Sequence, residues 1–255
     1  SVDLMDLVVN ADWVSGLLLA STRVAGFVIA SPIFKSFPTT GRTAMVLVLG
    51  YAFAEPVAES GDLGVLLTAG FTNAVVGLTL GFLTGLIFYI FTVGGSLIDF
   101  TSSLSAAAIF DPMSKDRVTI FGRIFNMLAM AMFLLLGGDR MLISGIGLSF
   151  EAVEITGTIS LSGGLADVAV GLMGRMMIGA IEMAMPALAA LFITEVILGI
   201  AARFAPQSNV FLIGLPVKLF AAFASVSAVL LLVPETLDGV MGIMSDTFRT
   251  ALLGM

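Results

Sequence analysis

Residues 63–98 contain no charged side chain, and this stretch restricts the possible folds more than any other feature of the sequence. A helix of about 20 apolar residues is long enough to cross the hydrocarbon core of a bilayer, and this stretch is longer than that. The rest of the chain agrees, since 58% of its residues are hydrophobic and only 11% are charged, whereas about a quarter of the residues in a soluble domain are charged. The apolar runs are continuous, and the strands of a membrane barrel would alternate apolar and polar residues. The sequence therefore predicts an all-α membrane protein.

Six long apolar segments divide the chain, and a short amphipathic tail at about 236–255 follows them. The segments are residues 13–34, 43–57, 63–98, 124–149, 168–202 and 210–233. We expect them to form polytopic, membrane-type helical hairpins. No internal repeat and no low-complexity linker separates them, so we expect a single domain, residues 1–255.

Two of these segments are too long for one simple membrane span. As single helices, residues 63–98 and 168–202 would each measure about 50 Å, against a hydrocarbon core of about 30 Å. Tilt absorbs part of the excess. We therefore expect a break, at Gly94 and Gly95 or at Pro186, or a helix that projects out of the bilayer.

The gaps between the segments differ in the sign of the charges that they carry. The second and fourth gaps hold acidic residues and no basic one, while the first, third and fifth gaps hold Lys35, Arg42, Lys115, Arg117, Arg123 and Arg203. The positive-inside rule then places the odd gaps in the cytoplasm and both termini on the outer side. Residues 1–13 carry three Asp and no basic residue, so we expect no cleavable secretory signal, which begins with a basic region.

Most enzyme chemistries lack the residues that they need. The chain has no Cys and no His, which excludes thiol nucleophiles, HExxH zinc sites and Ser–His pairs. An intramembrane enzyme would have to use an Asp pair or a Ser–Lys dyad, and Asp99 and Asp111 do not stand in a GxGD-like setting. A Walker motif is also absent. We therefore predict no catalytic residue, no cofactor and no metal site.

Several charged residues fall within the apolar runs, where each costs at least about 2.5 kcal/mol at the centre of a membrane helix. They include Arg23, Arg175, Glu182, Glu195 and Lys218. Arg175 and Glu182 share a helical face but lie about 10 Å apart along the axis. Such charges indicate either an ion path or anchors between helices and subunits. We predict that Arg23, Arg175, Glu182 and Glu195 are buried polar anchors, because no carboxylate stands at i+4 and no His could relay protons.

Gly77, Gly81 and Gly85 recur at four-residue spacing within the longest uncharged stretch. This spacing places them on one helical face, where the missing side chains let another helix approach closely. The pattern predicts tight helix packing.

The stretch "LGIAARFAPQSNVFLIGLPVKL" carries the most specific pattern in the sequence, with Gly, Arg, Pro, Gln, Asn, Gly, Pro and Lys in fixed order. These are Gly199, Arg203, Pro206, Gln207, Asn209, Gly214, Pro216 and Lys218. This pattern resembles the FliR family. Two further stretches, "SPIFKSFPTTGRTAMVLVL" and "NMLAMAMFLLLGGDRMLISGI", extend the resemblance over nearly the whole length of the chain. That family supplies the flagellar export-gate subunit, and SctT is its counterpart in virulence type III secretion. One position departs from the family, which often has His where Asp139 stands.

The resemblance implies assembly with several copies each of FliP and FliQ homologues, in a helical cone around a pore for unfolded export substrates. It implies a bacterial inner-membrane location in the flagellar basal body, an FlhB homologue as a further partner, and no nucleic acid. Residues of about 1–150 would be FliP-like, and those of about 165–235 a FliQ-like hairpin. The hairpin tip would face the cytoplasm and contact a partner through Arg203, Pro206, Gln207, Asn209 and Lys218.

In the resembled family, a loop at the place of residues 99–116 plugs the channel. A hydrophobic constriction that excludes water is one way to close a pore, so we predict that Phe100, Ile109 and Phe110 form part of the plug. The alternative is that these side chains pack under a cytoplasmic loop.

A secondary transporter is the runner-up interpretation of the whole chain. Such proteins place charged residues and broken helices near the bilayer midplane, as Glu182, Pro186 and Glu195 would provide. They are usually built from internal repeats, which this sequence does not show. We therefore favour the export-gate interpretation.

Overall fold

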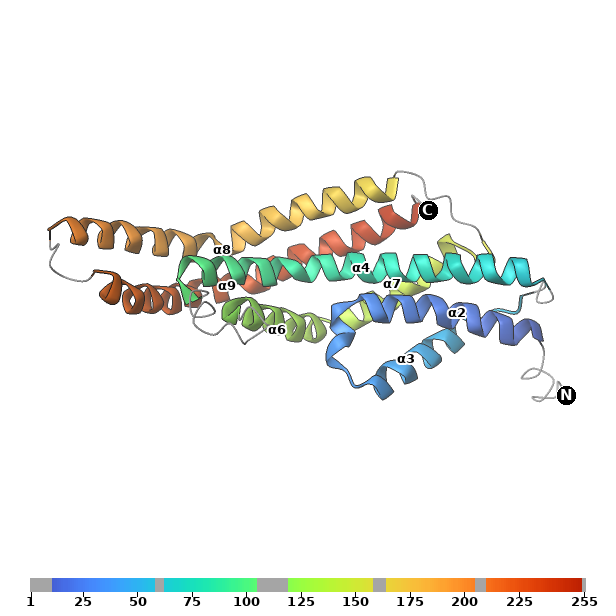
Figure 1. Ribbon diagram of the computed structural model, residues 1–255. Helices are drawn as coiled ribbons and strands as arrows, with labels where there is room; N and C mark the ends of the chain where they lie inside the picture. Colours follow the sequence, from blue (N-terminus) through green and yellow to red (C-terminus); the bar gives the residue numbers. More distant parts are fainter. Residues whose placement is uncertain (1–10, 58–61, 105–118, 158–163, 205–209, 254–255) are drawn as a thin grey trace. The chain divides into compact units, whose positions relative to one another are not determined.

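The computed structural model describes residues 11–57, 62–104, 119–157, 164–204 and 210–253. All regular elements in these ranges are helical, so the all-α prediction is confirmed (Figure 1). They are α2 (Ala11–Ala30), the 3₁₀ helix η1 (Pro32–Ser36), α3 (Thr39–Ala52), α4 (Leu63–Thr101), α6 (Ile120–Leu135), α7 (Gly138–Ala152), α8 (Gly164–Phe204) and α9 (Val210–Leu253).

Four of the described helices, α2, α4, α8 and α9, are long and apolar enough to cross a membrane. A fifth span results if α6 and α7 are counted together. The six predicted segments agree roughly with these helices, and the chain is a helical membrane protein.

The predicted breaks in the two longest segments are wrong. Helix α4 continues through Gly94 and Gly95, and α8 continues through Pro186. The two glycines serve close packing instead, since a Cβ on Gly94 would lie 3.0 Å from the carbonyl oxygen of Ala180, and one on Gly95 would overlap the backbone of Gly122. A proline inside a helix is tolerated in membrane-type helices, because neighbouring groups can satisfy the freed carbonyl.

Two other segment boundaries also differ from the prediction. The expected segment 124–149 is divided between α6 and α7, and Gly137 at the division has a φ of 82°. Glycine adopts this left-handed conformation without the steric cost that a Cβ brings. In contrast, α9 runs through Pro234, so the segment 210–233 and the tail as far as Leu253 form one helix of 44 residues.

The chain folds into two compact units, each made of segments that are distant in sequence. The first comprises Ser1–Ile87, Gly137–Leu172 and Gly242–Met255, and the second comprises Phe88–Leu136 and Met173–Met241. The single domain and its FliP-like and FliQ-like parts stay predictions.

The first unit has a small apolar core where Leu19, Val57, Ala69 and Ile155 are buried together. The second is rich in phenylalanine. The ring of Phe88 meets that of Phe133 edge-on at 5.1 Å between centroids, and Phe121 meets Phe223 in the same way at 5.3 Å. Aromatic pairs prefer such edge-to-face arrangements, which give the packing a defined geometry.

In the first unit, α2 and α4 approach so closely that glycine is required at their contact. A Cβ on Gly77 would overlap the carbonyl oxygen of Arg23, and one on Gly81 would overlap the backbone of Phe27. Gly85 has more room, because its Cβ would lie 3.2 Å from Cδ of Pro32. The glycine strip therefore lies against α2 and the first residues of η1.

Candidate functional site

Arg23 is buried in the first unit, with only 1% of its surface exposed. Its Nε donates a hydrogen bond to Oδ1 of Asn73 in α4 at 2.8 Å. Its two terminal nitrogens donate to backbone carbonyls at the end of α7, with Nη1 bonded to Ser149 at 2.5 Å and Nη2 to Val153 at 2.8 Å. The guanidinium group also lies 4.2 Å from the ring centroid of Phe150. Arg23 thus joins three helices.

The positive charge of Arg23 is stabilised by the carbonyl dipoles at a helix end and by the face of an aromatic ring. The last carbonyls of a helix have no partner within the helix, and they carry the negative end of its dipole. The guanidinium group supplies several donors in one plane and also interacts with aromatic faces. Asn73 extends the network, since its Nδ2 donates to the carbonyl oxygens of Ala69 and Ile155. These contacts give Arg23 an anchoring role within the chain.

Asp99 holds a second polar site, at the end of α4 in the second unit. Its carboxylate accepts hydrogen bonds from the backbone N–H of Phe121 at 3.1 Å and of Gly122 at 3.3 Å, both in the first turn of α6. The first N–H groups of a helix lack intrahelical acceptors, so a carboxylate there is a favourable cap. From the sequence alone, Asp99 stands out only as half of a possible catalytic pair. The sequence did contain a signal for this cap, because Asp99 stands directly after a long apolar run.

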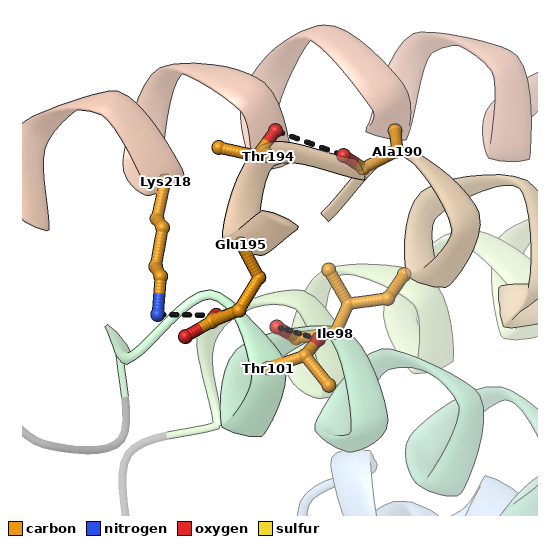
Figure 2. A network of polar contacts seen from close by, with 6 residues as sticks. All are labelled: Ile98, Thr101, Ala190, Thr194, Glu195 and Lys218. Atoms are coloured by element: carbon orange, nitrogen blue, oxygen red, sulfur yellow. Dashed lines mark hydrogen bonds and ion pairs between the residues drawn. The ribbon is translucent and has the colours of Figure 1, made fainter. Parts of the chain in front are cut away.

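Glu195 of α8 and Lys218 of α9 form an ion pair with 2.5 Å between Oε2 and Nζ. Figure 2 shows the two side chains pointing toward each other, in a view that also contains Ile98 and Thr101 of α4. The side chain of Glu195 is 61% exposed and that of Lys218 is 18% exposed. The sequence predicts Glu195 as a buried anchor and Lys218 as part of the hairpin tip, and it does not indicate that the two residues pair.

A cleft of about 360 Å³ opens beside this ion pair. Its other lining residues come from the end of α4, the last turns of α8 and the first turns of α9, and they are Ser103, Leu198, Gly199, Ala202, Gly214 and Leu215. Ser103 follows the last turn of α4 with a φ of 65°, the left-handed conformation that often ends a helix. The described ends of α4, α8 and α9 therefore lie together around the Glu195–Lys218 pair.

The remaining predicted anchors are exposed in this chain. Arg175 and Glu182 lie on the surface of α8, as Glu195 does. Only 22% of the most apolar window of α8 is buried within this chain, so the burial of these three residues as anchors in an assembly stays a prediction. Contacts with other subunits stay a prediction.

The predicted tip and plug fall partly outside the described residues. Arg203 is exposed in the last turn of α8, while Pro206, Gln207 and Asn209 lie outside the described ranges. Phe100 is 76% exposed near the end of α4, and Ile109 and Phe110 lie outside those ranges.

In the described part of the chain, no group of three acidic, His or Cys side chains could hold a metal ion. Arg23, Asp99 and the Glu195–Lys218 pair each connect helices in this part of the chain.

Comparison with known proteins shows similarity over almost the whole chain. The family model described as "Bacterial export proteins, family 1" matches residues 14–244. The flagellar biosynthetic protein FliR of Bacillus subtilis (strain 168) is 26% identical over 248 residues, which cover 94% of this chain and 96% of that protein. FliR of Escherichia coli (strain K12) is 27% identical over 89% of each chain. The surface presentation of antigens protein SpaR of Shigella flexneri is 30% identical over 148 residues, which cover 58% of this chain and 57% of that protein.

Proposed function

The chain belongs to family 1 of the bacterial export proteins, the FliR family, and on this basis we propose that it is an export-gate subunit of a flagellar type III secretion apparatus. The observation that carries the proposal is the match to residues 14–244. The similarity to FliR of Bacillus subtilis covers 94% of the chain, whereas that to SpaR covers 58%. This difference favours a flagellar apparatus over a virulence-associated one.

We propose that the chain forms the channel for unfolded export substrates together with homologues of FliP and FliQ. Helices α4, α8 and α9 contain 39, 41 and 44 residues. Each would measure about 60 Å, twice the hydrocarbon core of about 30 Å. Only 22% of the most apolar windows of α8 and α9 is buried within this chain. Lipid cannot cover helices of this length completely, so neighbouring subunits are needed to cover the rest.

The cytoplasmic side of the assembly would carry the tip between α8 and α9. Arg203 is an exposed basic residue at the end of α8, and basic residues favour the cytoplasmic side of a bacterial inner membrane. We place Arg203, Pro206, Gln207 and Asn209 there, in contact with an FlhB homologue. Both termini would then be periplasmic, and the assembly would belong to the flagellar basal body.

The closed state would be sealed by the segment that joins α4 to α6. We propose that Ile109 and Phe110 of this segment, together with Phe100 at the end of α4, form a hydrophobic constriction, as such residues do where pores close by excluding water. Phe100 already projects 76% exposed from the end of α4. The proposal gives the chain no catalytic role, and the energy for export would come from partner proteins.

Purification of the tagged chain from its own bacterium in a mild detergent, followed by native mass spectrometry, tests this function. We expect one complex with homologues of FliP and FliQ in fixed ratios. Recovery of a stable monomer that moves a small solute into liposomes would instead support a secondary transporter. That outcome would overturn the proposal.

A further inference from the structure

The turn that joins α2 to α3 (Figure 1) carries two basic side chains without an acidic partner. Lys35 is exposed in the last turn of η1, and Arg42 follows in the first turn of α3. Within the described residues, neither of them forms an ion pair. The Nε atom of Arg42 is buried, and no hydrogen-bond acceptor for it lies in the described part of the chain. Because a buried donor without an acceptor is costly, an acceptor from outside this chain would stabilise the turn.

The start of α3 adds further hydrogen-bond donors at the same place. Pro38 precedes the helix and gives it no side-chain cap. The first intrahelical bond runs from the N–H of Arg42 to the carbonyl oxygen of Pro38. The N–H groups of Thr39, Thr40 and Gly41 come before it, and such groups have no acceptor in their own helix and form the positive end of its dipole. A phosphate group, with several oxygen atoms and a negative charge, matches these donors and the two basic side chains.

An exposed apolar stripe begins less than a turn further along α3. Its members are spaced so that they share one helical face, and we call them the α3 stripe: Ala44, Leu47, Val48 and Tyr51. Leu47 is 62% exposed, Val48 67% and Tyr51 64%. Another side of α3 lies against α2, since a Cβ on Gly50 would overlap Ser21. The α3 stripe extends over about 11 Å of the helix axis, which is less than one leaflet, half of a hydrocarbon core of about 30 Å.

We propose that the turn between α2 and α3 binds an anionic phospholipid. Lys35 and Arg42 contact its phosphate group, and the α3 stripe contacts its acyl chains. The order of groups along α3 supports this occupant, because donors and charge come first and apolar side chains follow, as the headgroup and the tails do in a phospholipid. Basic residues at a membrane surface attract anionic lipids in this way. The inference goes beyond the export-gate function and does not depend on it.

Lipid binding to the tagged chain tests this site. The chain is purified from its own bacterium in a mild detergent with the partners that it retains. Native mass spectrometry then follows the binding of phosphatidylglycerol, or of phosphatidylcholine with the same acyl chains. We expect the wild-type chain to bind phosphatidylglycerol more tightly. The double variant Lys35→Gln/Arg42→Gln should weaken this binding about 25-fold, at about fivefold for each basic group.

Matched variants separate the site from general effects of charge and packing. Arg140→Gln/Arg249→Gln removes two exposed basic groups from the same unit and should bind phosphatidylglycerol like wild type. Arg42→Lys keeps the charge and should bind it more tightly than Arg42→Gln. If these two variants of Arg42 bind it equally, the residue only packs the turn and the inference is wrong. Equal binding of the two lipids by wild type, or equal binding of phosphatidylglycerol by wild type and the double variant, would also overturn it.

Crosslinking in membranes identifies what covers the α3 stripe. A photo-reactive amino acid replaces Leu47, and its adducts are identified by mass spectrometry. We expect phospholipid adducts, and fewer of them from Leu49, which is partly buried on the opposite side of α3. Adducts from position 47 only with another protein would mean that a protein covers the stripe, and the lipid site would be refuted.

Discussion

The carboxylate of Asp99 in α4 accepts a hydrogen bond from the backbone N–H of Phe121, 22 positions later at the start of α6. Gly122 donates a further hydrogen bond to the same carboxylate. The contact between Gly95 and the backbone of Gly122 brings the two helices close enough for this arrangement. Asp99 therefore ties together the two helices that flank the proposed plug segment.

Loss of this cap should loosen the junction between α4 and α6. Asp99→Ala leaves two buried N–H groups without their acceptor, at about 1–3 kcal/mol for an unsatisfied group. We expect a lower unfolding temperature in detergent and faster trypsin cleavage at Lys115 or Arg117. Asp62→Ala is the control, because Asp62 caps α4 through Gly64 at an exposed site, where a cap contributes about 1 kcal/mol. Equal effects of the two substitutions would show that Asp99 has no special role at this junction.

Alanine at Gly77 should separate α2 from α4. The new Cβ would overlap the backbone of Arg23, and overpacking of this kind costs about 1–3 kcal/mol. Gly85→Ala should be nearly neutral, because its Cβ would lie 3.2 Å from Pro32 and alanine gains about 1 kcal/mol of helix propensity over glycine. Thermal unfolding in detergent compares the two variants, with Gly242→Ala as the control in open space. The packing account fails if Gly77→Ala unfolds at the wild-type temperature.

The sequence could predict the helices but not what their glycines and charges contact. Apolar runs and composition predicted an all-α membrane protein, since both follow from the bilayer as solvent. The sequence alone predicts a break at Gly94 and Gly95, because it does not distinguish a flexible glycine from one in close contact with a distant helix. Gly137 does end a helix, and it differs from the other two glycines in its φ of 82° and in the open space around it.

The sites show the same limit. Arg23 could be recognised as costly in an apolar helix, but its acceptors Ser149 and Val153 lie 126 and 130 positions away. No pattern in one sequence indicates such distant partners. The pairing of Glu195 with Lys218 depends in the same way on how α8 and α9 come together.

Arg23→Met should destabilise the first unit strongly. Methionine fills similar space, but the acceptors on Asn73, Ser149 and Val153 lose their donors, at about 1–3 kcal/mol for each buried group. Arg23→Lys should be intermediate, because an ammonium group keeps the charge but lacks the planar fork. The measurement is the unfolding midpoint in detergent. Arg123→Met, at an exposed position in α6, should change stability by no more than about 0.5 kcal/mol; a similar loss in both variants would contradict the anchoring role.

Cysteine labelling should place the two ends of α8 on opposite sides of the membrane. The chain has no Cys of its own, so single cysteines can be introduced without a background. A membrane-impermeant thiol reagent added to intact cells should label Glu151→Cys, near the segment before α8, and should label Arg203→Cys only after the inner membrane is opened. Labelling of Arg203→Cys from outside would refute the proposed cytoplasmic tip.

Removal of the proposed plug should make the membrane leak while export continues. A pore that passes unfolded chains must exclude ions at rest, and a ring of large apolar side chains does so by excluding water. Phe110→Gly should therefore make cells that contain the assembled complex permeable to small ions and dyes. Phe37→Gly is a matched control, because Phe37 is 42% exposed and lies outside the helices. If the Phe110→Gly complex assembles normally and the membrane stays tight, these phenylalanines pack beneath a cytoplasmic loop, and the channel is closed by other residues.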